Sequence, residues 1–149
     1  MVKDLDTLME EVKELPHFEN PIGWMQYGRI PYKIRYNLEQ PAGTLVNRKT
    51  PALYKVTPDQ NLDGSSSESL SIWVWRGVPR DFRNILLYHE LKEAEFRFAD
   101  GLPKDESHKK AIPFHMAYAK KFLPESRFTE FQKWQSRYKA YGAESFFGK

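Results

Sequence analysis

Side chains that can bind a metal or move a proton recur at helical spacing in one part of this chain. His89, Glu90 and Glu93 lie close together, and His108 follows after a short break. At about 100° per residue, His89 and Glu93 are about 40° apart around a helix and about 6 Å apart along it. Glu90 lies about 100° from His89 on the same side. The sequence therefore predicts that these three side chains share one helical face.

The residue types in this set point to zinc. Two imidazoles and one carboxylate, here His89, His108 and Glu93, are the ligands of a catalytic zinc ion that keeps one position for water. Glu90 would then be the general base that takes a proton from that water, whose pKa the metal lowers. The chain has no cysteine, which excludes disulfides, thiolate zinc sites and a cysteine nucleophile.

The position of His108 depends on a predicted turn, Asp-Gly-Leu-Pro, around Gly101. The turn separates a helix predicted over about residues 80–98 from a second over about residues 104–122. In a tight antiparallel hairpin, Glu93 lies eight residues before Gly101 and His108 seven residues after it. We therefore expect Glu93 and His108 to come level.

His115 is a further candidate in the second helix. It lies fourteen residues after Gly101, and His89 lies twelve before it, so the two are expected one or two turns further in. His108 and His115 share a helical stripe, which would let both face the first helix. The second helix is, however, expected to be interrupted or kinked at Pro113, which would rotate His115 away. We consider His115 as an alternative ligand or as a group that steadies the transition-state oxyanion.

The first of these helices resembles that of the zincin metallopeptidases, whose signature is His-Glu-x-x-His on a helix that follows a mixed sheet. His89 and Glu90 match the first metal ligand and the catalytic glutamate of that signature. Glu93 stands where the family has its second histidine. Zincin subgroups that take a glutamate ligand from a later helix carry the same ligand set in the other order. The resemblance therefore implies that His108 supplies the missing imidazole.

The resemblance covers roughly residues 70–115 and includes a strand predicted before the helix. That strand, over residues 70–75, is similar to the edge strand on which zincins align an extended peptide above the metal. The resemblance implies a small zincin-like domain with zinc as cofactor. It also implies a peptide or protein substrate and hydrolysis of a peptide bond.

The elements around the site predict an α+β fold with an N-terminal helix, an antiparallel or mixed sheet of three or four strands, and a helical C-terminal half. Apolar residues at three- and four-residue steps predict the first helix over residues 5–15, ended by Pro16. Period-two alternation predicts strands over residues 30–38, 53–56 and 70–75. A last helix is interpreted as a packing element that carries four aromatic residues, Phe128, Phe131, Trp134 and Tyr138.

The helix over residues 80–98 is expected to be buried on most of its circumference. An apolar stripe opposite the candidate site consists of Leu87, Leu91, Ala94 and Phe98. The residues expected to meet solvent are Asn84, Tyr88, Lys92 and Glu95. Burying a histidine and two carboxylates in such a helix is costly unless a partner satisfies them.

A length of 149 residues predicts one domain, with residues 1–79 forming helix and sheet and residues 80–149 the helical part that holds the metal site. No apolar run approaches the roughly 18 residues that span a bilayer, and the acidic start lacks the features of a signal peptide. A cytoplasmic protein without a membrane partner is the simplest expectation. The net charge is only +3, and the basic residues between positions 29 and 55 are interpreted as a solvated face, so nucleic acid is not expected as a partner.

Three other interpretations compete with a catalytic zinc site. In the first, His89 is a structural histidine at a helix interface, Glu93 pairs with Arg97 four residues on, and Glu90 pairs with a basic group elsewhere. In the second, a metal stabilises the fold without catalysis. In the third, the chain is an interaction or nucleic-acid accessory domain that works through the basic residues between positions 29 and 55. The oligomeric state has no signal in the sequence.

Overall fold

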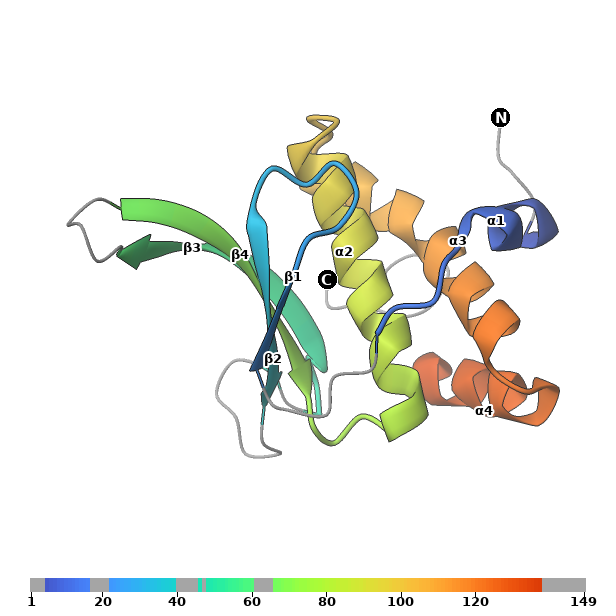
Figure 1. The fold of residues 1–149 in the computed structure, drawn as a ribbon. Helices are drawn as coiled ribbons and strands as arrows, with labels where there is room; N and C mark the ends of the chain where they lie inside the picture. The colour runs from blue at the N-terminus through green and yellow to red at the C-terminus, as the bar shows by residue number, and fades with distance from the viewer. Residues whose placement is uncertain (1–4, 17–21, 40–45, 47, 61–65, 138–149) are drawn as a thin grey trace.

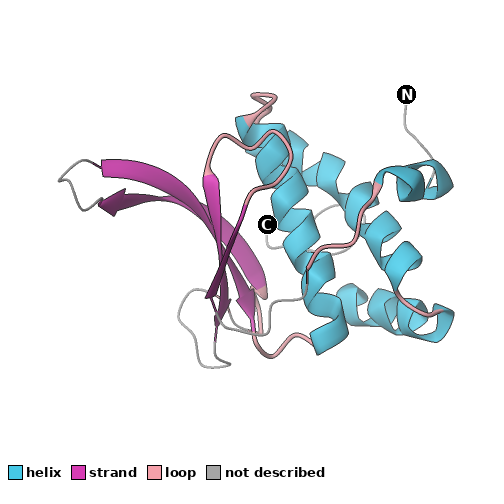
Figure 2. Cartoon of the chain, in the orientation of Figure 1, coloured by secondary structure: helices cyan, strands magenta, loops and turns pink. Residues whose placement is uncertain are grey.

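A four-stranded mixed sheet lies on one side of a layer of helices (Figures 1 and 2). The computed structural model describes residues 5–16, 22–39, 46, 48–60 and 66–137. Its strands are β1 (Ile22–Met25), β2 (Lys33–Glu39), β3 (Ala52–Gln60) and β4 (Ser66–Trp75). The β3–β4 hairpin extends beyond the helical layer, as Figure 1 shows.

The helical half follows the sheet in the chain and confirms the expected α+β class. Its helices are α2 (Arg83–Phe98), α3 (Lys104–Phe122) and α4 (Glu125–Ser136), and a short 3-10 turn at Arg80–Phe82 precedes α2. The N-terminal helix is α1 (Leu5–Glu11). No helix among these described elements is both long and apolar enough to cross a membrane. Tyr138, expected in the last helix, lies outside the described residues.

β4 is an interior strand of the sheet, so the expectation that residues 70–75 form an edge is wrong. The order is β1-β2-β4-β3, with β2 and β4 parallel and the two outer pairs antiparallel. Ile72 and Trp73 lie on opposite faces of β4, and Ile72 is completely buried whereas Trp73 is only partly buried. The pairing of β4 with β2 joins segments that are far apart in the sequence, so no local sequence pattern predicts it. β3 is the edge strand next to β4.

The inner face of the sheet packs against α2. Ile34, Leu70 and Ile72 from the sheet are completely buried, as are Leu87 and Leu91 of α2, and all five belong to one continuous core. Full burial of an aliphatic side chain of this size contributes about 1.5–3 kcal/mol. α2 is therefore held firmly between the sheet and α3.

The side of α2 that was expected to meet solvent is covered, so that expectation is wrong. Asn84, Tyr88 and Glu95 are buried, and Lys92 is only partly exposed. Segments far away in the sequence provide the cover. Asn84 Nδ2 donates to the carbonyl oxygen of Leu15 at 3.3 Å, which brings the chain after α1 onto α2.

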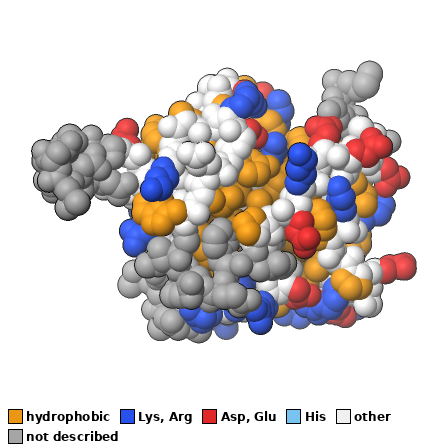
Figure 3. All heavy atoms as spheres, in the orientation of Figure 1, with side chains coloured by type: hydrophobic (Ala, Val, Ile, Leu, Met, Phe, Trp, Pro, Cys, Tyr) orange, Lys and Arg blue, Asp and Glu red, His pale blue; other side chains and the backbone are white. Residues whose placement is uncertain are grey.

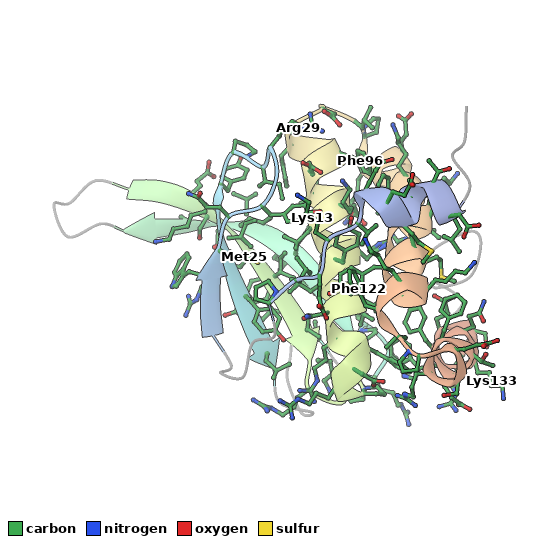
Figure 4. All side chains as sticks on the ribbon, turned by 45° about the vertical axis from the view of Figure 1, so that its right-hand side comes forward. Lys13, Met25, Arg29, Phe96, Phe122 and Lys133 are labelled. Atoms are coloured by element: carbon green, nitrogen blue, oxygen red, sulfur yellow. The ribbon has the colours of Figure 1, made fainter. Side chains whose placement is uncertain are left out.

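Glu95 fastens the turn before β2 to the C-terminal part of α2. Its Oε2 accepts the backbone N–H of Arg29 at 2.9 Å, and its Oε1 accepts from Lys92 Nζ at 2.8 Å. Gly28 lies against the carboxylate with φ +51°, and a Cβ there would come within 2.1 Å of Oε2. Only glycine fits this position without displacing Glu95. Figure 4 shows Arg29 near the same end of α2 as Phe96.

α2 and α3 form the antiparallel hairpin that was expected around Gly101. Gly101 has the left-handed φ of +72°, which glycine adopts without strain. α3 begins directly after Pro103 and continues through Pro113, so Pro113 does not interrupt it. The faces of α2 and α3 are thereby set against each other over several turns.

α1 is shorter than the helix predicted from the apolar spacing. It ends at Glu11, although Val12 and Leu15 remain buried. The N–H of Leu15 donates to the hydroxyl of Tyr118 at 3.0 Å. The segment after α1 is therefore bonded to α3 instead of continuing as a helix.

Candidate metal centre

Three potential metal ligands converge in the α2–α3 hairpin. His89 Nε2 lies 3.4 Å from Glu93 Oε1 and 3.4 Å from His108 Nδ1, and His108 Nδ1 lies 2.9 Å from Glu93 Oε1. We call these three atoms the ligand triangle. The expectation that His108 comes level with Glu93 is confirmed, because the turn at Gly101 folds the two helices closely together.

The size of the ligand triangle suits a tetrahedral zinc ion. At zinc–ligand distances of about 2.0–2.1 Å, neighbouring ligand atoms of a tetrahedron are about 3.3–3.4 Å apart. Two edges of the triangle have this length, and the third, between His108 and Glu93, is a hydrogen bond about 0.4 Å shorter. The His89 side chain is fully buried, whereas that of His108 is 15% exposed. The partly open side of the site is therefore at His108.

The charges in the ligand triangle favour a cation. Burial lowers the pKa of His89 to about 4, so its imidazole is neutral at physiological pH. Burial alone would raise the pKa of Glu93, but the neighbouring side chains of His108, His89 and Tyr54 hold it well below its ordinary value. An ionised carboxylate thus faces a neutral imidazole in a largely dry site. Such an arrangement attracts a positive ion.

Tyr54 of β3 is a partner of Glu93 that the sequence interpretation missed. Its hydroxyl donates to Glu93 Oε2 at 2.8 Å and accepts from Arg97 Nη1 at 3.5 Å. Burial raises the pKa of Tyr54, so the phenol stays protonated and remains a donor. The direct Glu93–Arg97 pair weighed above is not among the ion pairs of the described residues. The sequence interpretation placed Tyr54 in the strand predicted over residues 53–56 and assigned no partner to its side chain.

Glu90 is buried on α2, directly after His89 and three residues before Glu93. Its burial, and then the charge of Glu93, raise its pKa well above the ordinary value, and Lys104 opposes this in part. Within the described part of the chain, no hydrogen bond or ion pair reaches the Glu90 carboxyl, so the basic partner considered above is not found there. The protonated form of Glu90 is therefore more favoured than in an exposed glutamate, and a positive ion near Glu93 would favour the ionised form.

His115 lies behind His89 instead of beside the ligands. Its Nδ1 is 3.0 Å from Nδ1 of His89, on the side of that ring away from the ligand triangle, and its Nε2 is 3.3 Å from Gln135 Oε1. His115 is completely buried. The expected level pairing with His89 is confirmed. The structure does not bring His115 to the open side at His108, where an oxyanion would need a donor.

The edge strand β3 presents backbone groups next to this site. The N–H of Trp75 donates to the carbonyl of Pro51 at 2.8 Å, and in this antiparallel register alternate residues of β3 bond to β4. The backbone groups of Ala52, Tyr54 and Val56 therefore face outwards. Among the described strands, none pairs with this outer edge.

The basic strands are partly engaged within the chain. Lys33 Nζ lies 4.6 Å and Arg35 Cζ 5.8 Å from the ring centroid of Trp24, and Arg29 pairs with Asp100. Figure 3 shows that Lys and Arg side chains alternate with Asp and Glu over the helical half, so no single sign dominates that face. This distribution gives limited support to a polyanion-binding surface.

Comparison of the chain with protein-family models, curated proteins and solved structures found no match. The functional interpretation of the ligand triangle therefore depends on its own geometry and charge.

Proposed function

We propose that this chain is a zinc-dependent hydrolase of zincin type, with His89, Glu93 and His108 as ligands. The observation that carries the proposal is the ligand triangle, whose edges of 2.9–3.4 Å are close to those of tetrahedral zinc. Its ionised carboxylate and neutral imidazole offer lone pairs to one point. The partly exposed side at His108 leaves room for water as a fourth ligand.

The proposed chemistry assigns separate tasks to the two carboxyl groups. A bound zinc ion would lower the pKa of its water, which makes hydroxide available at neutral pH. Glu90 would take the proton from that water, because it is the second buried carboxyl on α2 near the ligands and burial raises its pKa, which makes it a stronger base than an exposed glutamate. Tyr54 would hold Glu93 in orientation through Oε2 while Oε1 binds the metal.

The edge strand supports a peptide as substrate. An extended peptide can add to a free sheet edge through backbone hydrogen bonds, and the outward groups of Ala52, Tyr54 and Val56 offer such an edge. Since the Tyr54 side chain reaches Glu93, a peptide on this edge would pass beside the ligand triangle. The aligning strand is therefore β3, and not β4 as the sequence resemblance implied.

Metal analysis is the first test. Protein purified and then mildly dialysed should hold about one zinc ion per chain. Absence of zinc, with none taken up on addition of zinc salt, would contradict the proposal. Zinc that raises the melting temperature without any peptide cleavage would favour the metal-stabilised module instead.

Glu90→Gln tests the catalytic assignment. The variant should keep zinc and lose about 10²–10⁴-fold in the rate of cleavage of an unfolded protein or a fluorogenic peptide mixture, because the general base is removed. Glu106→Gln, at an exposed position in α3, is the matched control and should cleave at the wild-type rate. Unchanged turnover in Glu90→Gln would exclude Glu90 as the base.

A further inference from the structure

A chain of hydrogen bonds leads from the ligand triangle to α4. His89 Nδ1 lies 3.0 Å from His115 Nδ1, His115 Nε2 lies 3.3 Å from Gln135 Oε1, and Gln135 Nε2 lies 3.2 Å from Met116 Sδ. Both imidazoles are completely buried. The His115 ring also packs edge-on against Phe131 of α4, with ring centroids 6.1 Å apart. α4 therefore contacts the metal centre through one ring.

The sulfur of Met116 determines which group donates and which accepts in each of these hydrogen bonds. A thioether sulfur can only accept, so the Gln135 amide turns its N–H towards Met116 and its oxygen towards His115. The Gln135 oxygen then requires a proton on His115 Nε2. This leaves the lone pair of His115 on Nδ1, where it accepts a proton from His89 Nδ1.

The direction determines what His89 presents to the ligand triangle. With its proton on Nδ1, a neutral His89 has its lone pair on Nε2, pointing at the site of the proposed metal. In the reverse direction Nε2 would carry the proton and donate to Glu93, and the ring could not bind a metal through that atom. Gln135 would then place its oxygen against the sulfur, two acceptors facing each other.

We propose that His115 and Gln135 are positioning residues that fix the tautomer of His89, so that Nε2 is available as a metal ligand. This inference rests on the zinc site proposed above and assigns α4 to it. One proton then remains inside the triangle, on His108 Nδ1, where it bonds to Glu93 Oε1. Zinc binding through that atom displaces this proton from Nδ1, the His108 ring then carries its proton on Nε2, and the protons of His89 and His115 stay in place.

Zinc affinity in variants of His115 tests the inference. His115→Phe keeps a ring of similar size but removes the acceptor, and zinc affinity measured by competition with a chromogenic chelator should fall about 10–100-fold. His115→Asn places an amide oxygen near the position of Nδ1 and should recover most of that loss, although it packs less well. Tyr118→Phe, which removes a buried hydrogen bond from the same helix, is the control and should bind zinc as the wild type does.

The proton positions can be read directly in the metal-free protein. In ¹⁵N-histidine NMR spectra, His89 should carry its proton on Nδ1 and His115 on Nε2, and Gln135→Leu should weaken this preference. The opposite pattern, or a folded His115→Phe variant that binds zinc at wild-type affinity, would overturn the inference. If wild-type protein binds no zinc, the proposed function fails, and the spectra of the metal-free protein still decide whether the hydrogen-bond chain has the stated direction.

Discussion

Two buried carboxylates lie two residues apart on α2 and have opposite kinds of partner. Glu95 accepts from the Lys92 ammonium and from the backbone N–H of Arg29. Although burial opposes it, these donors lower the pKa of Glu95. Glu93 accepts from the Tyr54 hydroxyl and from His108 Nδ1, and its Oε1 lies 3.4 Å from Nε2 of the neutral, fully buried His89. Both carboxylates are less than one-tenth exposed.

The difference separates a structural carboxylate from a candidate ligand. Glu95 is compensated by a fixed cation and by a backbone donor, so nothing further is needed to keep it buried. Glu93 has an uncharged phenol and imidazole rings as neighbours and, among the described residues, no fixed cation paired with it. A carboxylate surrounded in this way gains most from an added cation. Burial alone does not distinguish the two sites, whereas the chemistry of their donors does.

The strongest test of this comparison replaces each carboxylate in turn. Glu93→Gln should weaken zinc binding more than about 100-fold, beyond the loss expected from an outer partner, because a ligand is removed. Glu95→Gln should keep zinc affinity and lower the free energy of unfolding by about 1–3 kcal/mol, because buried donors lose their charged acceptor. Chelator competition and urea unfolding measure the two effects. Equal loss of zinc in both variants would remove the distinction.

The pH dependence of stability should also separate the two sites. The folded pKa of His89, about 4, lies below its unfolded value near 6.5, so its contribution to stability is complete above pH 6.5 and is lost as the pH falls towards 4. Between pH 7 and pH 5 the metal-free protein should lose about 2 kcal/mol of unfolding free energy from His89 alone.

Urea unfolding of metal-free protein at several pH values measures this loss. Burial also lowers the pKa of His115, so it adds to the slope in the same direction. His89→Phe should flatten the dependence without abolishing it. A wild-type unfolding free energy that does not change between pH 7 and pH 5 would show that these imidazoles are not held neutral.

The smallest expected effect concerns the second oxygen of Glu93. Tyr54→Phe removes the hydroxyl that donates to Oε2 and should lower zinc affinity about 10-fold, at the lower end for an outer partner, with little change in fold. Tyr32→Phe is a matched control, since Tyr32 also packs edge-on against Phe98 but has no bond to Glu93 among those of the described residues. Tighter zinc binding in Tyr54→Phe would contradict an orienting contact.

The part of the site that sequence could predict depends on short-range geometry. The facing of Glu93 and His108, and of His89 and His115, followed from helical periodicity and one turn at Gly101. The facing of residues across a helical hairpin is determined by the turn and by the helical residues on either side of it. The same counting also predicted the bounds of α3 correctly.

The parts that sequence missed depend on long-range contacts. Tyr54 reaches Glu93 only because β3 lies at the edge beside β4, and that order follows from the parallel pairing of β2 with β4. Gln135 reaches His115 because α4 folds back across α3 (Figure 1). Glu95 was expected in solvent, but a turn at Arg29 covers it. That turn comes from residues far earlier in the chain, so helical periodicity around Glu95 could not predict it. No local sequence pattern predicts these three long-range contacts.

The outer edge of β3 that could receive a peptide could also pair with a strand of another copy of the chain. Pro58 limits such intermolecular pairing. Pro58 follows Ala52, Tyr54 and Val56 in the outward-facing register of β3, and proline has no N–H to offer. A strand added along β3 thus finds a gap in the row of outward donors between Val56 and Gln60. The uninterrupted part of the edge suits a short peptide, and the gap disfavours an extended intermolecular sheet along the whole of β3.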